Sequence, residues 1–429
     1  MRRPVLNIVT MGCSKNKVDS EHLAALLHEK YVIHHDSDKP SDVVIINTCG
    51  FIGDAQEESV DTILEYAELR KQQKIKKLYV TGCLSQRFKK ELQAEIHEVD
   101  GFYGVESVNL IAADILKETP QSQYCSRRVL STPKHYAYLK ISEGCNRRCA
   151  FCAIPLIRGP HVSVPMDDLL EEARGLARQG VKELILIAQD LTYYSIDLDG
   201  KSHIVALVKA LCEIDGIEWI RLHYGYPLGF PDELLDLMRE NPKICHYIDL
   251  PLQHVSTHLL KAMRRGVDKE QTLGFVENVR RHVPDIAFRT TFIVGFPGET
   301  EADFEELCQF IRDMRFERAG VFAFSPEEGT PAYEMTDDVP DEVKQERVDR
   351  LMEIQQNISL EINASRVGKV EKVLIDRLEG DYYVGRSQYD SPEVDDEILI
   401  PAGQALEIGT FYQVRIEQAD YFDCYGVVV

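Results

Sequence analysis

Short apolar, β-branched segments alternate with stretches of helical spacing through most of the chain, and this alternation constrains the fold more than any other feature. Between residues 5 and about 115, the strand-like runs are VLNIVT, DVVIIN and KKLYVT, and helices are expected from about Asp19, from about Gln56 and near Gln86. Strands that alternate with helices predict a parallel sheet covered by helices. We therefore predict an amino-terminal parallel α/β domain over residues 1–118.

A second alternating series lies between Tyr136 and Phe324. Its six strand candidates are YAYLKIS, ELILIA, EWIRLH, HYIDL, AFRTTFIV and RAGVFAF, and segments such as MDDLLEEARGLARQ between them have helical spacing. Six β/α units predict a partial (β/α)6 barrel, a fold that carries its chemistry at the carboxyl ends of the strands. A helix from about Asp341 to Arg366, with Gly368 as its stop, completes a core domain predicted over residues 131–364. The polar, proline-containing segment 117–134 is expected to be a linker.

The last segment has a different pattern, with five short alternating runs separated by Gly, Pro and Asp. These runs are KVEKVLI, YYVGRS, DEILI, FYQVRI and CYGVVV. They predict a small antiparallel β-barrel over residues 366–429. The expected fold class is thus a multidomain α/β protein with a carboxy-terminal barrel.

Composition narrows the cellular setting. The chain has 429 residues, of which 44% are hydrophobic, yet no apolar run approaches the length of a membrane span, and the first residues do not form a secretory signal. The eleven cysteines are therefore expected to stay reduced, which favours metal binding or catalysis over disulfides. We expect a cytoplasmic protein without membrane contact.

The central cysteines lie in the run EGCNRRCAFCAIP, directly after the first core strand. Cys145, Cys149 and Cys152 form a CxxxCxxC pattern. Three thiolates can hold three irons of a four-iron cluster and leave the fourth iron open to an exchangeable ligand. Structural zinc normally needs four ligands, and the next candidate, His161, lies beyond a Gly-Pro turn. The spacing favours the cluster over zinc.

With the aromatic residue before its last cysteine, this loop resembles the signature of the radical S-adenosylmethionine (SAM) superfamily. The resemblance implies that the open iron binds SAM and that reductive cleavage releases a 5'-deoxyadenosyl radical. It also implies that Phe151, Gln189, Gly295 and Gly298 contact SAM, with Asp190 beside them. An ordinary strand-to-helix turn would equally explain the two glycines. No catalytic side chain is predicted beyond the cluster ligands.

Three further cysteines each follow a strand of the amino-terminal domain. Cys13, Cys49 and Cys83 stand at nearly equal intervals after IVTMGC, VIINTCG and YVTGC. Because the carboxyl ends of parallel strands share one edge, these thiols are expected to converge. Buried packing cysteines are the alternative. A second three-thiolate cluster with an open iron, placed beside a radical generator, would suit sulfur insertion.

The order of three-cysteine domain, radical core and small barrel resembles the methylthiotransferase family. The resemblance implies two [4Fe-4S] clusters, one SAM as methyl donor, a second SAM as radical source, and an electron donor such as flavodoxin or ferredoxin. This family divides into enzymes of transfer RNA and the RimO branch, which modifies the β-carbon of an aspartate in a small-subunit ribosomal protein, the twelfth. The segments CSKNKVDSE, ISEGCNRRCAFCAIP and GRSQYDSPEVDDEI resemble the RimO branch.

Charge offers an independent test of substrate class. Residues 366–429 contain six Lys or Arg and thirteen Asp or Glu, within a chain of net charge -22. An RNA-binding barrel should be basic, with aromatic stacking residues among its cations. The aromatic side chains are present: Tyr382, Tyr383, Tyr389, Phe411 and Tyr412. However, an acidic stretch lies among them: Asp390, Glu393, Asp395, Asp396 and Glu397.

These charges predict an acidic face that attracts a basic ribosomal protein, free or within the ribosome, and no direct RNA binding. The alternative is that these charges belong to an ordinary solvated surface that binds no partner. A transfer RNA adenosine methylthiotransferase is the alternative within the family. An electron-transfer iron-sulfur protein is the alternative from another class, although it would need neither open iron sites nor a nucleoside pocket.

Several other residues keep simpler interpretations. Gln253 and His254 follow the fourth core strand and either reach the active site or are structural. Arg147 and Arg148 are expected to be solvated or to lie near the cluster. The cysteines without ligand spacing are interpreted as packing or linker thiols: Cys125, Cys212, Cys245, Cys308 and Cys424.

Overall fold

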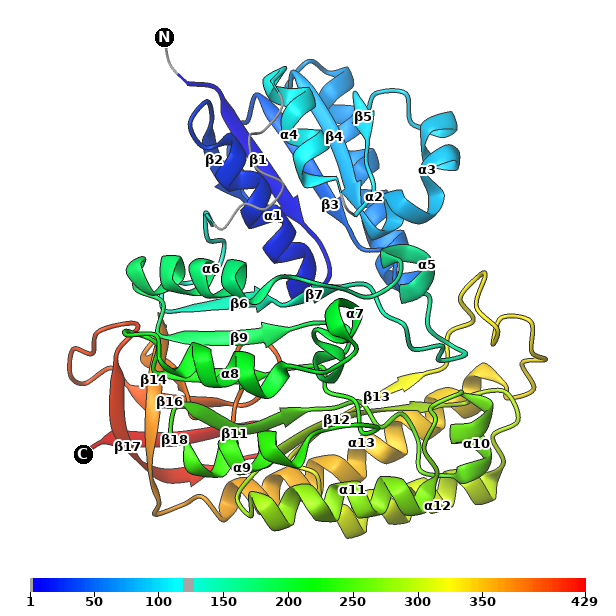
Figure 1. The fold of residues 1–429 in the computed structure, drawn as a ribbon, viewed down its shortest axis with the longest axis vertical. Helices are drawn as coiled ribbons and strands as arrows, with labels where there is room; N and C mark the ends of the chain where they lie inside the picture. The colour runs from blue at the N-terminus through cyan, green and yellow to red at the C-terminus, as the bar shows by residue number, and fades with distance from the viewer. Residues whose placement is uncertain (1–2, 106, 119–126) are drawn as a thin grey trace.

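A computed structural model describes residues 3–105, 107–118 and 127–429. These described residues form two parallel sheets and a closed barrel, with one short two-stranded pair in addition. Figure 1 shows the amino-terminal sheet above the core and the tail barrel at one end of the core strands. Part of the predicted linker, together with Cys125, lies outside the described residues. In the described part of the chain, no helix is both long and apolar enough to cross a membrane.

The amino-terminal sheet has the order β2-β1-β3-β4-β5, and all its pairings are parallel. Its central strand β3 is buried along its whole length, as expected for a strand covered on both faces. The strands are β1 (Val5–Thr10), β2 (Val32–His35), β3 (Val43–Thr48), β4 (Lys77–Gly82) and β5 (Gly101–Phe102). The helices are α1 (Ser14–Leu27), α2 (Gly53–Lys71), α3 (Cys83–Glu95) and α4 (Val108–Leu116).

The first three helices begin earlier than the sequence pattern predicts. Cys13 is the N-cap of α1, α2 begins at Gly53, and Cys83 is the first residue of α3. Apolar spacing reveals only the part of each helix that packs on the sheet, so this pattern does not predict the first helical turn. The thiols of Cys13 and Cys83 therefore lie at the amino termini of helices. The helix dipole favours negative charge there, so these positions favour the thiolate forms that bind iron.

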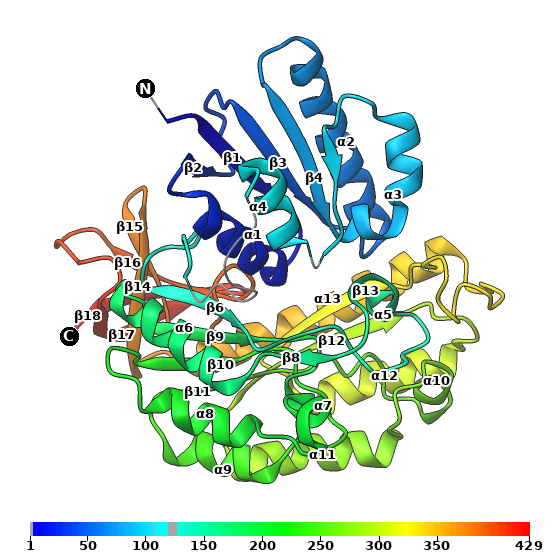
Figure 2. The same ribbon diagram turned by 45° about the horizontal axis from the view of Figure 1, so that its top comes forward.

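The core sheet confirms all six predicted strands, in the order β13-β12-β11-β10-β9-β6. The described pairings within it are parallel, and the two edge strands do not pair with each other, so the barrel is partial. Its open side faces the amino-terminal sheet, and α1 contacts β6 there (Figure 2). The strands are β6 (Tyr136–Lys140), β9 (Glu183–Ile187), β10 (Trp219–Leu222), β11 (Ile244–Asp249), β12 (Ala287–Val294) and β13 (Arg318–Ala323).

Helices cover the outer face of the core sheet and enclose its largest apolar cluster. The longest of them, α13 (Asp341–Ala364), agrees with the predicted helix, and Gly368 has the positive φ expected of a stop. The other core helices are α5 (Ile154–Arg158), α6 (Met166–Arg178), α7 (Ile196–Asp199), α8 (Ile204–Cys212), α9 (Asp232–Glu240), α10 (Thr257–Ala262), α11 (Lys269–His282) and α12 (Glu301–Met314). Shorter elements are β7 (Ser142–Glu143), β8 (Val162–Ser163) and the 3-10 turn η1 (Leu191–Tyr193).

The tail closes into a five-stranded barrel in the order β14-β15-β16-β18-β17. Its strands are β14 (Val370–Glu379), β15 (Tyr382–Arg386), β16 (Glu397–Pro401), β17 (Phe411–Ala419) and β18 (Asp423–Val428). The predicted small antiparallel barrel is confirmed, with the exception of one pairing, because β16 and β18 run parallel. This pairing completes the ring through strands that are not consecutive, which alternation within each strand cannot reveal. The barrel packs at the amino ends of the core strands, where Phe411 lies edge-on to Trp219 with ring centroids 4.7 Å apart.

Candidate functional site

The central cysteines lie on a loop between β7 and α5, at the carboxyl end of β6. Backbone hydrogen bonds fix this loop: the N–H of Cys145 donates to Gly159 O (3.1 Å) and that of Cys152 to Cys149 O (3.2 Å). Gly144 has a φ of +71°, and a Cβ there would meet the carbonyl oxygen of Pro160. Only glycine fits this close approach, so the loop conformation is encoded locally.

Donors surround the central thiols. The backbone N–H of Arg147 lies 3.4 Å from Cys145 Sγ, and the guanidinium Nη1 of Arg265 lies 3.3 Å from Cys149 Sγ. Burial raises the pKa of the Cys145 thiol to about 11 and that of Cys152 to about 12. Without metal these two thiols are therefore neutral at pH 7, and binding iron would displace their protons. The donors then suit the negative charge that a thiolate cluster brings.

Two arginines extend the surroundings of this loop. Arg265 is buried, and its guanidinium stacks 4.3 Å from the ring centroid of Tyr226. Arg147 stacks on the same ring at 4.0 Å and pairs with Asp190 at 2.8 Å. Asp190 also caps η1 by accepting from the N–H of Thr192. Neither Arg265 nor Tyr226 is predicted from the sequence, because nothing in their spacing from the cysteines marks them.

The amino-terminal cysteines follow β1, β3 and β4 at one sheet edge. Gly12 has a φ of +82°, and a Cβ there would lie 2.8 Å from Cys49 Sγ, so glycine lets Cys49 approach the loop that carries Cys13. Burial raises the pKa of the Cys49 thiol and raises that of Cys83 to about 11. Cys83 is more deeply buried than predicted, packed beside Val105. Negative charge on Cys13 or Cys49 would raise the pKa of the Cys83 thiol further, because the three thiols lie at one sheet edge.

Arg158 connects the two cysteine sets. Its Nη2 lies 3.5 Å from Cys83 Sγ, and its Nη1 lies 2.9 Å from both carboxylate oxygens of Glu143, two residues before Cys145. Lys140 also binds Glu143, at 2.8 Å. The side chain of Arg158 is almost fully buried, so it is fixed between the two sheets. Sequence reasoning missed this residue, although IPLIRGP follows the cysteine loop directly.

The donor arrangement bears on the choice between a cluster and a single ion. Within the described residues, no three His, Cys, Asp or Glu side chains lie close enough together to hold one metal ion. Zinc would need its ligands within about 2.0–2.3 Å of a common centre. In a four-iron cluster each thiolate binds a different iron, so the sulfurs stand further apart. Three thiolates match the ligand number of a four-iron cluster with one open iron, and a cluster remains the prediction for both cysteine sets.

The side chains predicted to contact SAM differ in what surrounds them. Gln189 donates to Glu143 at 3.0 Å, while its Oε1 is buried and has no partner among the described residues. The Oε1 atom of Gln253 is also buried and has no hydrogen-bond partner among the described residues, and the backbone of Gln253 has a strained φ of +73°. Both amides follow core strands at their carboxyl ends. Unsatisfied buried acceptors at this edge fit a polar ligand such as SAM.

The other predicted contacts have local explanations. A Cβ at Gly295 would lie 2.2 Å from Lys344 Cγ, so packing of α13 requires this glycine, and the N–H of Gly298 donates to Asp338 at 2.7 Å. Phe151 packs in the cluster that contains Phe296. Their contacts with SAM remain predictions.

His254 is structural. It is fully buried, and its Nε2 lies 3.2 Å from Glu299 Oε1 while its Nδ1 accepts from the N–H of Ser256. Thr300 caps α12 through a capping box with Asp303. The remaining described cysteines are buried packing residues, as predicted: Cys212, Cys245, Cys308 and Cys424.

The acidic stretch of the tail overturns the charge argument made from sequence. Asp390 is fully buried, 2.8 Å from Arg318, and Asp395 pairs with Arg289 at 3.3 Å. Asp396 likewise contacts Arg318, at 3.1 Å. These carboxylates point into the core barrel and are neutralised there, so they form no exposed face. Glu393 and Glu397 are more exposed and each has a basic partner.

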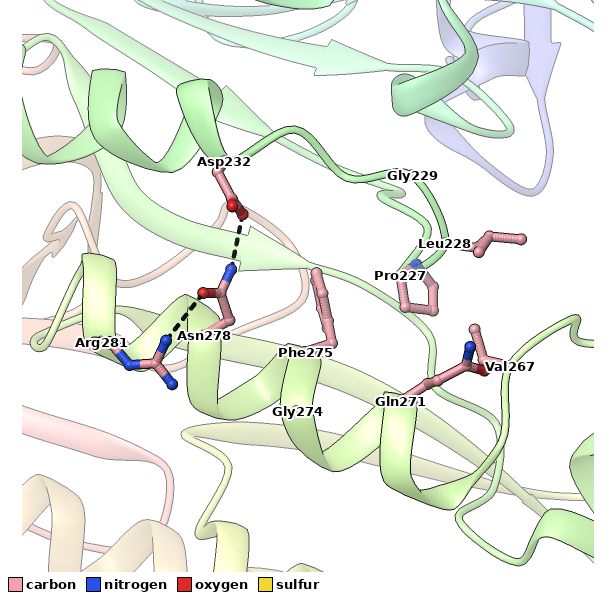
Figure 3. Close-up of a pocket in the computed structure, with 10 residues that line it drawn as sticks. All are labelled: Pro227, Leu228, Gly229, Asp232, Val267, Gln271, Gly274, Phe275, Asn278 and Arg281. Carbon is pink, nitrogen blue, oxygen red and sulfur yellow. Dashed lines mark hydrogen bonds between the residues drawn. The ribbon is translucent and has the colours of Figure 1, made fainter.

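A hollow of about 420 Å³ lies between α9 and α11 (Figure 3). Asn278 lines the hollow: its Nδ2 donates to Asp232 Oδ1 at 2.8 Å, and its Oδ1 accepts from Arg281 Nη1 at 3.4 Å. None of the predicted cluster or SAM residues lines this hollow, although the carbonyl oxygen of Leu228 at its wall accepts from Arg147 Nη2 at 3.2 Å.

Three family models match the chain. They are the radical SAM superfamily over residues 139–311, the uncharacterized protein family UPF0004 over residues 5–104, and the TRAM domain over residues 367–429. The core also resembles solved structures. The radical SAM methyltransferase TsrM from Kitasatospora setae matches with a TM-score of 0.56 at 14% identity, covering 77% of this chain and 74% of that chain. At this identity the likeness concerns the fold alone.

Curated relatives match over the full length. The ribosomal protein uS12 methylthiotransferase RimO of Bacteroides thetaiotaomicron is 52% identical over 100% of this chain and 99% of its own. The RimO protein of Cytophaga hutchinsonii is 50% identical over 99% of this chain and 98% of its own.

The partial parallel barrel, the CxxxCxxC loop at its strand ends and the superfamily match define a radical SAM enzyme, a class that uses SAM and a [4Fe-4S] cluster. Within that class, the full-length identity places the chain in the RimO family of methylthiotransferases, to which it belongs.

Proposed function

We propose that the chain transfers a methylthio group to the β-carbon of an aspartate in ribosomal protein uS12. The relatives at 50–52% identity carry uS12 as substrate in their names. The observation in this chain that carries the proposal is the approach of two three-cysteine sets across Arg158. One set suffices for radical generation, so the second needs a separate role, and delivery of sulfur is that role. A substrate of the ribosome places the reaction in the cytoplasm.

We infer that Cys145, Cys149 and Cys152 hold one [4Fe-4S] cluster, and that a second is held by the amino-terminal set, Cys13, Cys49 and Cys83. When bound, the central cluster and SAM would supply a radical that removes hydrogen from carbon, and the second cluster would supply methylated sulfur.

The chain's own residues prepare this site. Arg265 places a buried cation against Cys149 Sγ, and Arg158 places another against Cys83 Sγ, so each set has charge that offsets thiolates. Glu143 holds Arg158 and Lys140 in position from the radical loop. Because α1 contacts β6, the two sheet edges are fixed relative to each other, which a two-centre reaction needs.

The test uses purified protein, reconstituted anaerobically with iron and sulfide, then given SAM, a chemical reductant and one of two substrates. A peptide that carries the uS12 aspartate is expected to gain a methylthio group in place of one hydrogen, detected by tandem mass spectrometry. Unmodified transfer RNA, incubated in parallel, is expected to remain unchanged. Modification of the RNA and not of the peptide would assign the chain the alternative substrate.

A further inference from the structure

Lys15 is a buried lysine between the loop that carries Cys13 and the carboxyl end of core strand β10. It belongs to the first turn of α1, two residues after Cys13, and is only 8% exposed. Its Nζ lies 3.2 Å from the ring centroid of Tyr224, which follows β10 of the core. The side chain therefore reaches from the amino-terminal sheet to the carboxyl edge of the core sheet.

The ammonium of Lys15 lacks an oxygen acceptor among the residues that the structure describes. It has three N–H donors, and the face of one ring can engage only one direction. Within the described ranges, no oxygen lies within hydrogen-bond distance of Lys15 Nζ, whereas two nearby lysines are paired. Lys17 lies 2.6 Å from Glu393, and Lys140 lies 2.8 Å from Glu143. A buried, unpaired cation is costly, so its presence here points to an anion that arrives with a ligand.

The neighbouring carboxylates pair with other cations. Glu143 binds Lys140 and Arg158, and Asp249 binds Arg289 through Oδ1 at 3.1 Å, while its buried Oδ2 has no partner among the described residues. Neither carboxylate is within ion-pair distance of Lys15 Nζ. The positive charge of Lys15 is thus available at the edge where both cysteine sets lie.

We propose that Lys15 binds the side-chain carboxylate of the aspartate that is modified, and so selects aspartate over its amide. The inference rests on the proposed function. An ion pair to this carboxylate would hold the adjacent β-carbon between the two cysteine sets, which is the placement that hydrogen removal and sulfur delivery both need. Asparagine would offer the cation only a neutral amide oxygen in place of a negative charge, which gives discrimination without any steric difference.

The test compares Lys15→Met with the matched control Lys17→Met, whose lysine lies two residues further along α1 and already has a carboxylate partner. Each reconstituted protein is assayed with the aspartate peptide and with its asparagine counterpart, and KM is measured for peptide and for SAM. For Lys15→Met, kcat/KM on the aspartate peptide is expected to fall about 10- to 100-fold, mostly through KM, as for loss of one charged hydrogen bond. Its preference for aspartate over asparagine is expected to fall equally, while Lys17→Met retains both values.

Three results would overturn the inference. Unchanged KM and unchanged preference in Lys15→Met would show that the lysine does not contact the carboxylate. A rise in KM for SAM alone would assign it to the methionyl carboxylate of SAM. A fall in activity with the aspartate preference intact would assign it a structural role. Failure of the wild-type protein to modify the peptide at all would instead refute the proposed function.

Discussion

Replacing Asp390 by Asn is expected to loosen the junction between the core and the tail barrel. Asp390 is fully buried, with Oδ1 2.8 Å from Arg318 and Oδ2 3.0 Å from Arg366. Burial by itself would raise the pKa of this carboxyl, but the two guanidinium groups outweigh burial and hold the pKa well below its usual range. Breaking a buried ion pair costs about 3–5 kcal/mol. Because Asn keeps one acceptor, we expect the lower end, about 3 kcal/mol.

The single tryptophan reports on this junction. Trp219 is buried at the start of β10 and lies against Phe411 of the tail barrel, so separation of the two parts exposes it and shifts its fluorescence. The free energy of unfolding is taken to fall by about 2 kcal/mol for each molar increase in urea. A loss of about 3 kcal/mol in that free energy then lowers the urea midpoint of unfolding by roughly 1.5 M. The apo protein suits this titration because no cluster then contributes to stability.

Glu397→Gln is the matched control in the same acidic stretch. Glu397 pairs with Arg377, and both side chains are partly exposed, so the pair contributes about 0–1 kcal/mol and the midpoint should move by less than roughly 0.5 M. Equal shifts in the two variants would refute the reasoning. So would an unchanged midpoint in Asp390→Asn accompanied by weaker peptide binding, because the stretch would then act as a docking face.

Three further predictions concern the clusters and pH. Replacing the amino-terminal cysteines together by Ala is expected to remove about half of the reconstituted iron while reductive cleavage of SAM continues; full iron content would contradict two separate sites. Arg265→Gln is expected to speed loss of iron to a chelator, because Cys149 Sγ loses its charged donor, and an unchanged rate would deny Arg265 that role. Burial raises the pKa of Asp396 to about 6, above its ordinary 3.8, so the folded state binds this proton more tightly and stability falls as pH rises through about 6. Between about pH 5 and pH 7.5 the free energy of unfolding followed by Trp219 should therefore drop by about 1.4 kcal/mol, because pH 5 lies about one unit below the folded pKa, and Asp396→Asn should flatten this drop; an equal drop in both proteins would count against the assignment.

Much of the fold follows from local sequence patterns. The six core strands and the strands before Cys13, Cys49 and Cys83 are apolar runs bounded by turns, and the structure contains all of them. The short strands β2 and β5 were not predicted, because four or two residues carry too little periodicity. The positions of the cysteines after strands were likewise readable, since strand, turn and cysteine are contiguous in the chain.

The charges that organise the site were not readable. Arg158, Arg265 and Lys15 act on cysteine loops or strands far from them in sequence, and a charged side chain gives no local sign of burial. The prediction that the acidic stretch of the tail forms an exposed face was wrong for the same reason. Asp390 reads as surface charge until the fold brings Arg318 and Arg366 to it. The sequence argument from charge was therefore unsound, although the relatives support the protein substrate that it favoured.

The most direct test of the account is mass analysis of ribosomal protein uS12, together with transfer RNA, from cells with and without the gene for this chain. The account predicts a methylthio group on one uS12 aspartate that is present only with the gene, and identical transfer RNA in both strains. Loss of a methylthio group from transfer RNA, with uS12 unmodified in both strains, would contradict it.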